Sequence, residues 1–172
     1  MENIVLKHYI HNERCDIISL EFGARKQVID WAYAHVKAHP DRKYIILTHE
    51  YLTAKGVRIS KNSSAQYYFE STNTTYSTPD YIWKNLIEDN NNIISVICGH
   101  NGFSKKLFTR NSNNREVAQI LFNIQYQPNG GDGLIQIWEF PPNSNQVNVV
   151  TYNTNTRQVY RGEDHNYNFL YK

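Results

Sequence analysis

Two histidines each follow an apolar run of the kind that forms a buried strand. Residues 43–48 lead into His49, and residues 92–98 lead through Gly99 into His100. A continuous apolar run that stops at turn residues is typical of a strand covered on both faces. In α/β sheets the carboxyl ends of such strands lie at the edge where ligands bind. The sequence therefore predicts that His49 and His100 meet at one sheet edge, where their imidazoles could share a metal ion.

A structural role is the alternative for both residues. One histidine after a strand more often makes structural hydrogen bonds than binds a ligand, and two at equivalent positions leave the two roles evenly balanced. No catalytic residue is assigned from the sequence. The other five histidines are expected to be solvated or structural: His8, His11, His35, His39 and His165.

Helices are expected between the strands that carry these histidines. Residues 24–39 follow a strand at 15–22 and have a helical pattern, with one apolar face that includes Val28 and Trp31. Pro40 ends this helix. A second helix is expected over residues 79–89, with Thr78 as its N-cap. Strand, helix and strand alternate twice, so the sequence predicts two βαβ units and a parallel sheet.

The pattern changes after residue 102. Strands are expected at residues 105–109, 117–127, 134–140 and 146–153, and turn-rich connections between them indicate antiparallel hairpins. The predicted fold class is α/β with α+β character, in which βαβ units precede an antiparallel meander. Residues 1–172 form a single domain in this interpretation, with an α/β part at 15–102, an antiparallel part at 103–158 and a packed tail at 159–172. Residues 1–14 are expected to be irregular.

Composition excludes some classes of partner. The chain has 172 residues and a formal charge of +2, and its basic residues are dispersed, which argues against nucleic acid. No apolar stretch reaches the length of a membrane span. Cys15 and Cys98 are expected to be buried free thiols. The localisation is left open: cytoplasmic as written, or extracytoplasmic if the sequence belongs to a longer secreted precursor.

An ordered set of short segments resembles the calcineurin-like metallophosphoesterases, and more narrowly the C-terminal half of their bacterial members. The resemblance runs from about Ile17 to Tyr152. Its segments are Ile-Ile-Ser-Leu-Glu-Phe-Gly at 17–23, Val-Ile-Asp-Trp-Ala at 28–32, His-Pro-Asp-Arg at 39–42, Thr-His-Glu-Tyr at 48–51, Ile-Trp-Lys-Asn-Leu at 82–86, Gly-His at 99–100, and Gln-Tyr-Gln at 125–127 before Gly-Gly-Asp-Gly at 130–133.

The resemblance implies part of a four-layer α/β/β/α sandwich with two metal ions at the carboxyl edges of its sheets. His49 and His100 would be metal ligands, and the ions would be manganese, iron or zinc. His100 matches the first histidine of the family's Gly-His-x-His motif, whereas the last would fall at Gly102. The family's Asp-x-His, Gly-Asp and Gly-Asn-His-Asp segments do not occur before His49, so the site is incomplete. Gly131-Asp132 is expected in a hairpin turn, and residues 162–165 are expected to be solvated.

The function implied is the C-terminal portion of a metal-dependent phosphoesterase that hydrolyses a phosphomonoester or phosphodiester. This portion would be inactive until the missing half supplies the other ligands. The alternative is a non-catalytic binding or scaffold module that keeps the fold and uses the Tyr-, Asn- and Thr-rich loop at residues 50–78 as its contact surface. Because half of the sandwich is missing, an uncovered sheet is also expected to favour a homodimer or a remodelled sheet.

Overall fold

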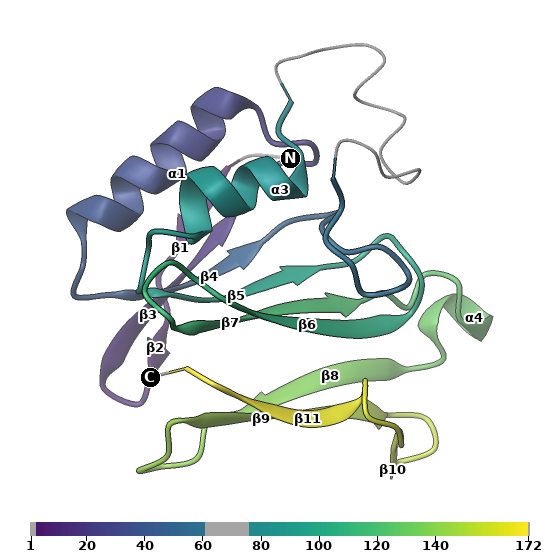
Figure 1. The fold of residues 1–172 in the computed structure, drawn as a ribbon. Helices are drawn as coiled ribbons and strands as arrows, with labels where there is room; N and C mark the ends of the chain where they lie inside the picture. Colours follow the sequence, from purple (N-terminus) through teal and green to yellow (C-terminus); the bar gives the residue numbers. More distant parts are fainter. Residues whose placement is uncertain (1–2, 61–75, 172) are drawn as a thin grey trace.

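A computed structural model describes residues 3–60 and 76–171, which form three layers (Figure 1). Helices α1 (Lys26–Ala38) and α3 (Pro79–Ile82) lie over one face of a first sheet, and a second sheet covers the other face. The α/β fold class is confirmed. Within the described ranges, no helix is long and apolar enough to cross a bilayer.

The first sheet has seven strands and carries both predicted βαβ units. Its strand order is β1-β3-β4-β5-β7-β6, and β2 pairs with β3. Neighbouring pairs β3–β4, β4–β5 and β5–β7 are parallel, whereas β6 joins β7 antiparallel. The strands are β1 (Ile4–Leu6), β2 (Tyr9–Ile10), β3 (Glu13–Ser19), β4 (Lys43–Leu47), β5 (Ile93–Cys98), β6 (Ser104–Arg110) and β7 (Glu116–Phe122).

The second sheet is antiparallel and follows the short turn α4 (Pro128–Gly131). Strand β9 pairs with β8 on one side and with β10 and β11 on the other. The antiparallel strands expected after residue 102 are therefore present. However, the β6–β7 hairpin completes the first sheet, because β7 also pairs in parallel with β5. The strands of the second sheet are β8 (Leu134–Glu139), β9 (Gln146–Asn153), β10 (Gln158–Val159) and β11 (Asn166–Leu170).

Two apolar clusters hold the three layers together. The first lies between the helices and the first sheet and includes Ile46, Trp83 and Leu86, so the predicted inward face of the second helix is confirmed. That helix widens after α3 into a π-helical turn, η2 (Trp83–Ile87), in which the Glu88 N–H donates to the Trp83 carbonyl. The second cluster lies between the two sheets, where alternate residues of β9 point inward.

Both ends of the described chain are more regular than predicted. Residues 4–10 contain β1 and β2, so the expectation of an irregular start is wrong. The expected tail contains β10 and β11, and Phe169 of β11 is buried between the sheets. These strands are two to five residues long. Such short segments carry a weak pattern, and pairing with longer neighbours defines them.

Several smaller features can be compared with the sequence-based expectations. Cys15 and Cys98 are buried free cysteines, as predicted. Trp31, placed on the inner face of the first helix, is 39% exposed, because the buried stripe runs instead through Val28, Ile29, Ala32 and Val36. Gly131-Asp132 does not lie in a hairpin turn. It belongs to the connection that carries the chain from the first sheet to the second.

The loop at residues 50–78 is described only at its two ends. Residues 61–75 lie outside the described residues, so the proposed contact surface there is not tested. At the first end, Tyr51, Leu52 and Ile59 are fully buried. This part of the loop therefore packs against the core of the protein.

Candidate functional site

The carboxyl ends of β4 and β5 bring His49 and His100 together. The two strands are parallel neighbours, and Leu47 pairs with Ile97. His49 Nε2 and His100 Nδ1 are 3.0 Å apart, and the ring centroids are separated by 4.7 Å. The predicted meeting of the two side chains is therefore observed, while their role as metal ligands stays a prediction.

Backbone hydrogen bonds hold the two histidine loops side by side. The Thr48 N–H donates to the Ile97 carbonyl at 3.0 Å, and the Gly99 N–H donates to the His49 carbonyl at 2.9 Å. The Asn101 side-chain amide then donates to Glu50 Oε1 at 2.9 Å and to the Leu52 carbonyl at 3.1 Å. These contacts continue the pairing beyond the strand ends. They fix the geometry of the imidazole pair in advance.

The loop after β5 requires a left-handed backbone. His100 has φ of +69°, a conformation that is unfavourable for most residues other than glycine and that is frequent at functional sites. Gly102 has φ of +58°, and a Cβ atom there would lie 2.9 Å from Ala54 Cα. A side chain at this position would therefore displace the facing loop. In the metallophosphoesterases that the sequence resembles, the last histidine of the Gly-His-x-His motif would fall at this position.

Phe22, which follows β3 at the same sheet edge, contacts both imidazoles. Its ring centroid lies 4.7 Å from that of His49 and 5.9 Å from that of His100. This contact was not predicted from the sequence, although the place of Phe22 after a buried strand was a usable signal. Burial, and then the neighbouring His100, lower the pKa of His49, while Glu50 acts in the opposite direction. His49 is therefore neutral at neutral pH, the form that ligates metals.

Two cavities flank the histidine pair. One of about 210 Å³ is lined by His49 and by residues at the ends of β3 and β4. The other, of about 350 Å³, is lined by Glu21, Phe22, Arg25 and Tyr76. Arg25 Nε lies 2.7 Å from Glu21 Oε1. The side-chain hydrogen bonds of Arg25, helped by its backbone N–H and by Asn3, lower the pKa of Glu21 to about 2 against the opposing effect of burial. An ionised, paired carboxylate therefore stands beside the aromatic wall of the site.

The histidine pair fits a metal ion only in part. A tetrahedral zinc ion with Zn–N bonds of about 2.0–2.1 Å holds two imidazole nitrogens about 3.3 Å apart. The observed 3.0 Å separation is a few tenths of an ångström shorter and also suits a hydrogen bond between the rings. Among residues 3–60 and 76–171, no group of three or more His, Cys, Asp or Glu side chains could hold an ion. At this sheet edge the described residues thus offer two candidate ligands, His49 and His100.

The remaining histidines lie away from this pair. His8 and His11 are exposed, as predicted, and His39 Nδ1 lies 2.9 Å from the His35 carbonyl. The prediction of a solvated 162–165 segment is wrong for its last two residues. Asp164 pairs with Lys105 at 2.5 Å, and the half-buried His165 ring packs against Phe103 and Tyr160. Phe103 and Lys105 lie at or just before the start of β6, about 60 residues before the segment, so nothing local in the sequence signals these two partners.

No family model matches this chain. The chain is similar to the uncharacterized protein YvnB of Bacillus subtilis, with 25% identity over 142 residues. The match covers 79% of this chain but 10% of YvnB, so the chain spans about a tenth of the length of that relative. Because YvnB is itself uncharacterized, the histidine pair must be interpreted from its own geometry.

Two histidines outside the pair predict a loss of stability in mild acid. Burial is the main cause of the lowered pKa values of His35 and His165. The unfolded chain therefore binds more protons than the folded chain as the pH falls below the usual histidine value of 6.5. The stabilisation is complete above this pH and decreases as the pH falls toward the folded-state values. Thermal unfolding between about pH 5 and pH 7.5 should show a falling midpoint on acidification. A constant midpoint would contradict the prediction.

Proposed function

We propose that this chain is the C-terminal portion of a metal-dependent phosphoesterase and that His49 and His100 are two of its metal ligands. The observation that carries this proposal is the 3.0 Å separation of His49 Nε2 and His100 Nδ1 at adjacent ends of parallel strands. The resemblance of residues 17–152 to the metallophosphoesterases supports the reaction class. The lowered pKa of His49 supports ligation, because protons compete less with a cation.

The two imidazoles do not suffice for hydrolysis on their own. Phosphoester hydrolysis at such a centre draws on bound divalent ions for an activated water and for stabilisation of the charged phosphoryl oxygens. Two ions a few ångströms apart also need an anionic ligand between them, whereas His49 and His100 are uncharged when they ligate. We therefore expect little turnover from this chain by itself. The missing carboxylates would come from another segment or another chain.

A non-catalytic binding or scaffold module is the second candidate. The observation that favours it is that the described residues supply two ligands, which can instead hydrogen-bond to each other. In this case the histidines would retain only a structural role. A homodimer remains a separate prediction. The exposed apolar residues of the outer face of the second sheet, Ile135, Ile137 and Leu170, are its candidate contacts.

Metal binding distinguishes the two candidates. We expect equilibrium dialysis against Mn²⁺, Fe²⁺ and Zn²⁺ in turn to give close to one bound ion per chain for at least one metal. His100→Ala and His49→Ala should each weaken that binding by about tenfold or more, because one imidazole would then hold the ion alone. The exposed His11 provides a matched control, and His11→Ala should bind as the parent does.

Two results would reject the phosphoesterase proposal for this site. One is the absence of saturable binding by all three metals, and the other is equal binding by the parent and both site variants. Either result would favour the binding-module candidate. In a longer protein that supplies the missing ligands, His100→Ala should lower phosphoesterase turnover by orders of magnitude.

A further inference from the structure

A third, larger cavity lies at the opposite edge of the first sheet, at the amino ends of the parallel strands. It has a volume of about 540 Å³, within the usual range for small-molecule sites. The β2–β3 hairpin, the segment before β4, the segment before β5 and the β6–β7 turn all contribute to its lining. We call it the basic cavity, and the residues that matter here are Tyr9, Arg14, Arg42, Lys43, Asn92 and Arg115.

A buried carboxylate beneath the basic cavity orients two of its guanidinium groups. Asp16 is completely buried. Arg14 binds it with two hydrogen bonds, Nε to Oδ1 at 2.8 Å and Nη2 to Oδ2 at 3.1 Å. Arg42 reaches the same carboxylate from the other loop at 3.4 Å. The single negative charge of Asp16 thus holds both guanidinium groups in place but neutralises only one of them. One positive charge is left for a ligand.

The guanidinium groups keep most of their donors free. Each guanidinium has five N–H donors in a planar fork. Within residues 3–60 and 76–171, Asp16 accepts two hydrogen bonds from Arg14 and one from Arg42, and Arg115 donates one to a backbone carbonyl. The hydroxyls of Tyr9 and Tyr44 also interact with Arg14 and Arg42, respectively, so up to six of the fifteen donors are taken. Arg115 donates through Nη2 to the Tyr171 carbonyl at 3.3 Å. Among these residues no carboxylate lies within ion-pair distance of Arg115, although Lys43 pairs with Glu13.

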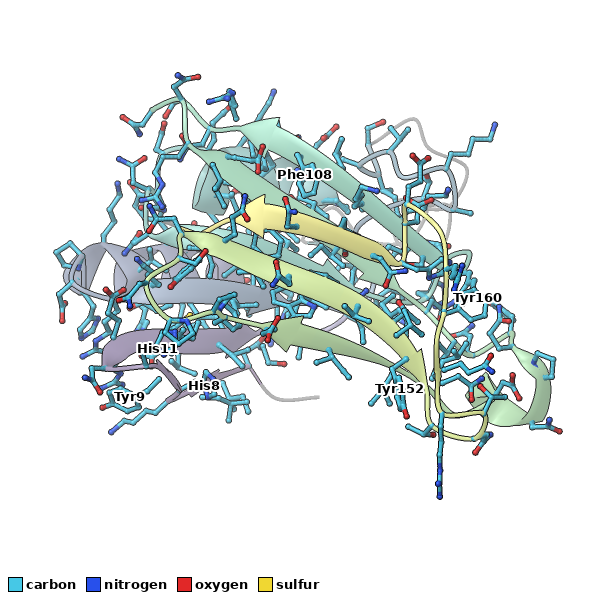
Figure 2. All side chains as sticks on the ribbon, turned by 90° about the horizontal axis from the view of Figure 1, so that it is seen from below. His8, Tyr9, His11, Phe108, Tyr152 and Tyr160 are labelled. Atoms are coloured by element: carbon cyan, nitrogen blue, oxygen red, sulfur yellow. The ribbon has the colours of Figure 1, made fainter. Side chains whose placement is uncertain are left out.

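The lining as a whole is positively charged. It also has amide and aromatic side chains that could contact the uncharged part of an anionic ligand. Its charged residues are four basic and two acidic, and the buried Asp16 that pairs with two of the arginines brings the net charge of the group to +1. Asn92 and two further asparagines supply amide donors and acceptors. Tyr9, which is 58% exposed, adds a ring at the hairpin. Figure 2 shows Tyr9, which lines the basic cavity, and Tyr160 at opposite ends of the molecule. Tyr160 packs against Phe103 in the loop that follows His100, so the basic cavity lies far from the histidine pair.

We propose that the basic cavity binds a small phosphorylated molecule. Arginine forks match the oxygens of a phosphate group in a bidentate manner, and guanidinium groups lose less hydration than lysines do. Three arginine forks line one cavity, from strand β3, from the segment before β4 and from the β6–β7 turn. Three forks can contact more than one phosphate group, which favours a ligand such as a diphosphate. The proposal concerns residues remote from His49 and His100 and does not depend on the phosphoesterase proposal.

Calorimetric titration of the whole chain with inorganic pyrophosphate, in metal-free buffer, tests the proposal. We expect saturable binding at one site. Arg115→Ala should weaken it roughly tenfold, because one charge-assisted hydrogen-bonding group is lost. Arg115→Lys keeps the charge without the fork and should also bind more weakly than the parent. Arg110→Ala, in the same β6–β7 hairpin but outside the cavity lining, is the matched control and should bind as the parent does.

Further titrations test where pyrophosphate binds and whether phosphate is preferred. His100→Ala should bind pyrophosphate as the parent does, and a loss of binding in that variant would overturn the assignment to the basic cavity. Citrate, a polyanion without phosphate, should bind more weakly than pyrophosphate, and equal binding would overturn the preference for phosphate. The proposal also fails if pyrophosphate does not saturate the chain at millimolar concentration, or if folded Arg115→Ala binds it unchanged.

Discussion

Asp16→Asn is expected to lower the free energy of unfolding by about 2–4 kcal/mol, since removing one partner of a buried ion pair leaves the other uncompensated. Asp16 has no exposed surface, and both Arg14 and Arg42 hydrogen-bond to it. The substitution keeps the volume of the side chain, so lost charge and lost hydrogen bonds dominate the effect. Urea denaturation at neutral pH, read by circular dichroism, gives the change in unfolding free energy.

The pKa of Asp16 gives an independent check on this ion pair. Burial alone would raise that pKa, but the hydrogen bonds and charge of Arg14 lower it below the usual 3.8. The stabilisation by Asp16 is therefore complete above this value and is lost as the pH falls through the folded-state pKa. Asp30→Asn, on the exposed face of α1, is the control and should change the unfolding free energy little. An equally small change for Asp16→Asn would contradict the prediction.

Phe169→Ala is expected to cost about 3–5 kcal/mol of stability, the usual range for deleting a buried phenylalanine side chain. Phe169 is 2% exposed and lies between the two sheets, where its ring meets Trp138 edge to face at 5.3 Å. Removing the ring leaves a cavity that the two sheets cannot close without moving together. Thermal and urea unfolding measure the loss.

The next residue in β11 supplies the control for this measurement. Leu170 points to the outer face of the second sheet and is 47% exposed. Leu170→Ala should therefore change the unfolding free energy by less than about 1 kcal/mol, as is usual for surface substitutions. If both variants lose the same small amount, the C-terminal strand does not contribute to the core as its burial indicates.

The central parallel strands were predictable because their apolar runs carry the signal locally. The runs ending at His49 and Cys98 correspond to β4 and β5, with boundaries that differ by at most two residues. The partner of a strand is encoded less directly. A short turn indicated that β7 pairs with β6. The parallel pairing of β7 with β5 depends on the tertiary fold, and no local sequence pattern indicates it. The fully buried centre of β7 suits a position between two neighbours.

The candidate site was predictable only in its two histidines. Their proximity follows from parallel neighbouring strands, which is a general property of α/β sheets. The contact of Phe22 with both rings depends on how the chain turns after β3. The bonds of Asn101 to Glu50 and Leu52 depend on two loops folding against each other. The basic cavity was not predicted, because its arginines come from segments that are far apart in the sequence.

The register of β4 and β5 has a consequence for recognising distant sequences. Leu47 pairs with Ile97, and the histidines follow two and three residues later. One residue of extended chain spans about 3.3 Å, which exceeds the 3.0 Å between the two ring nitrogens. An insertion or deletion in either loop would separate the pair, whereas a substitution leaves the spacing unchanged. The number of residues between strand end and histidine is therefore a better marker of this site than the identity of the residues between them.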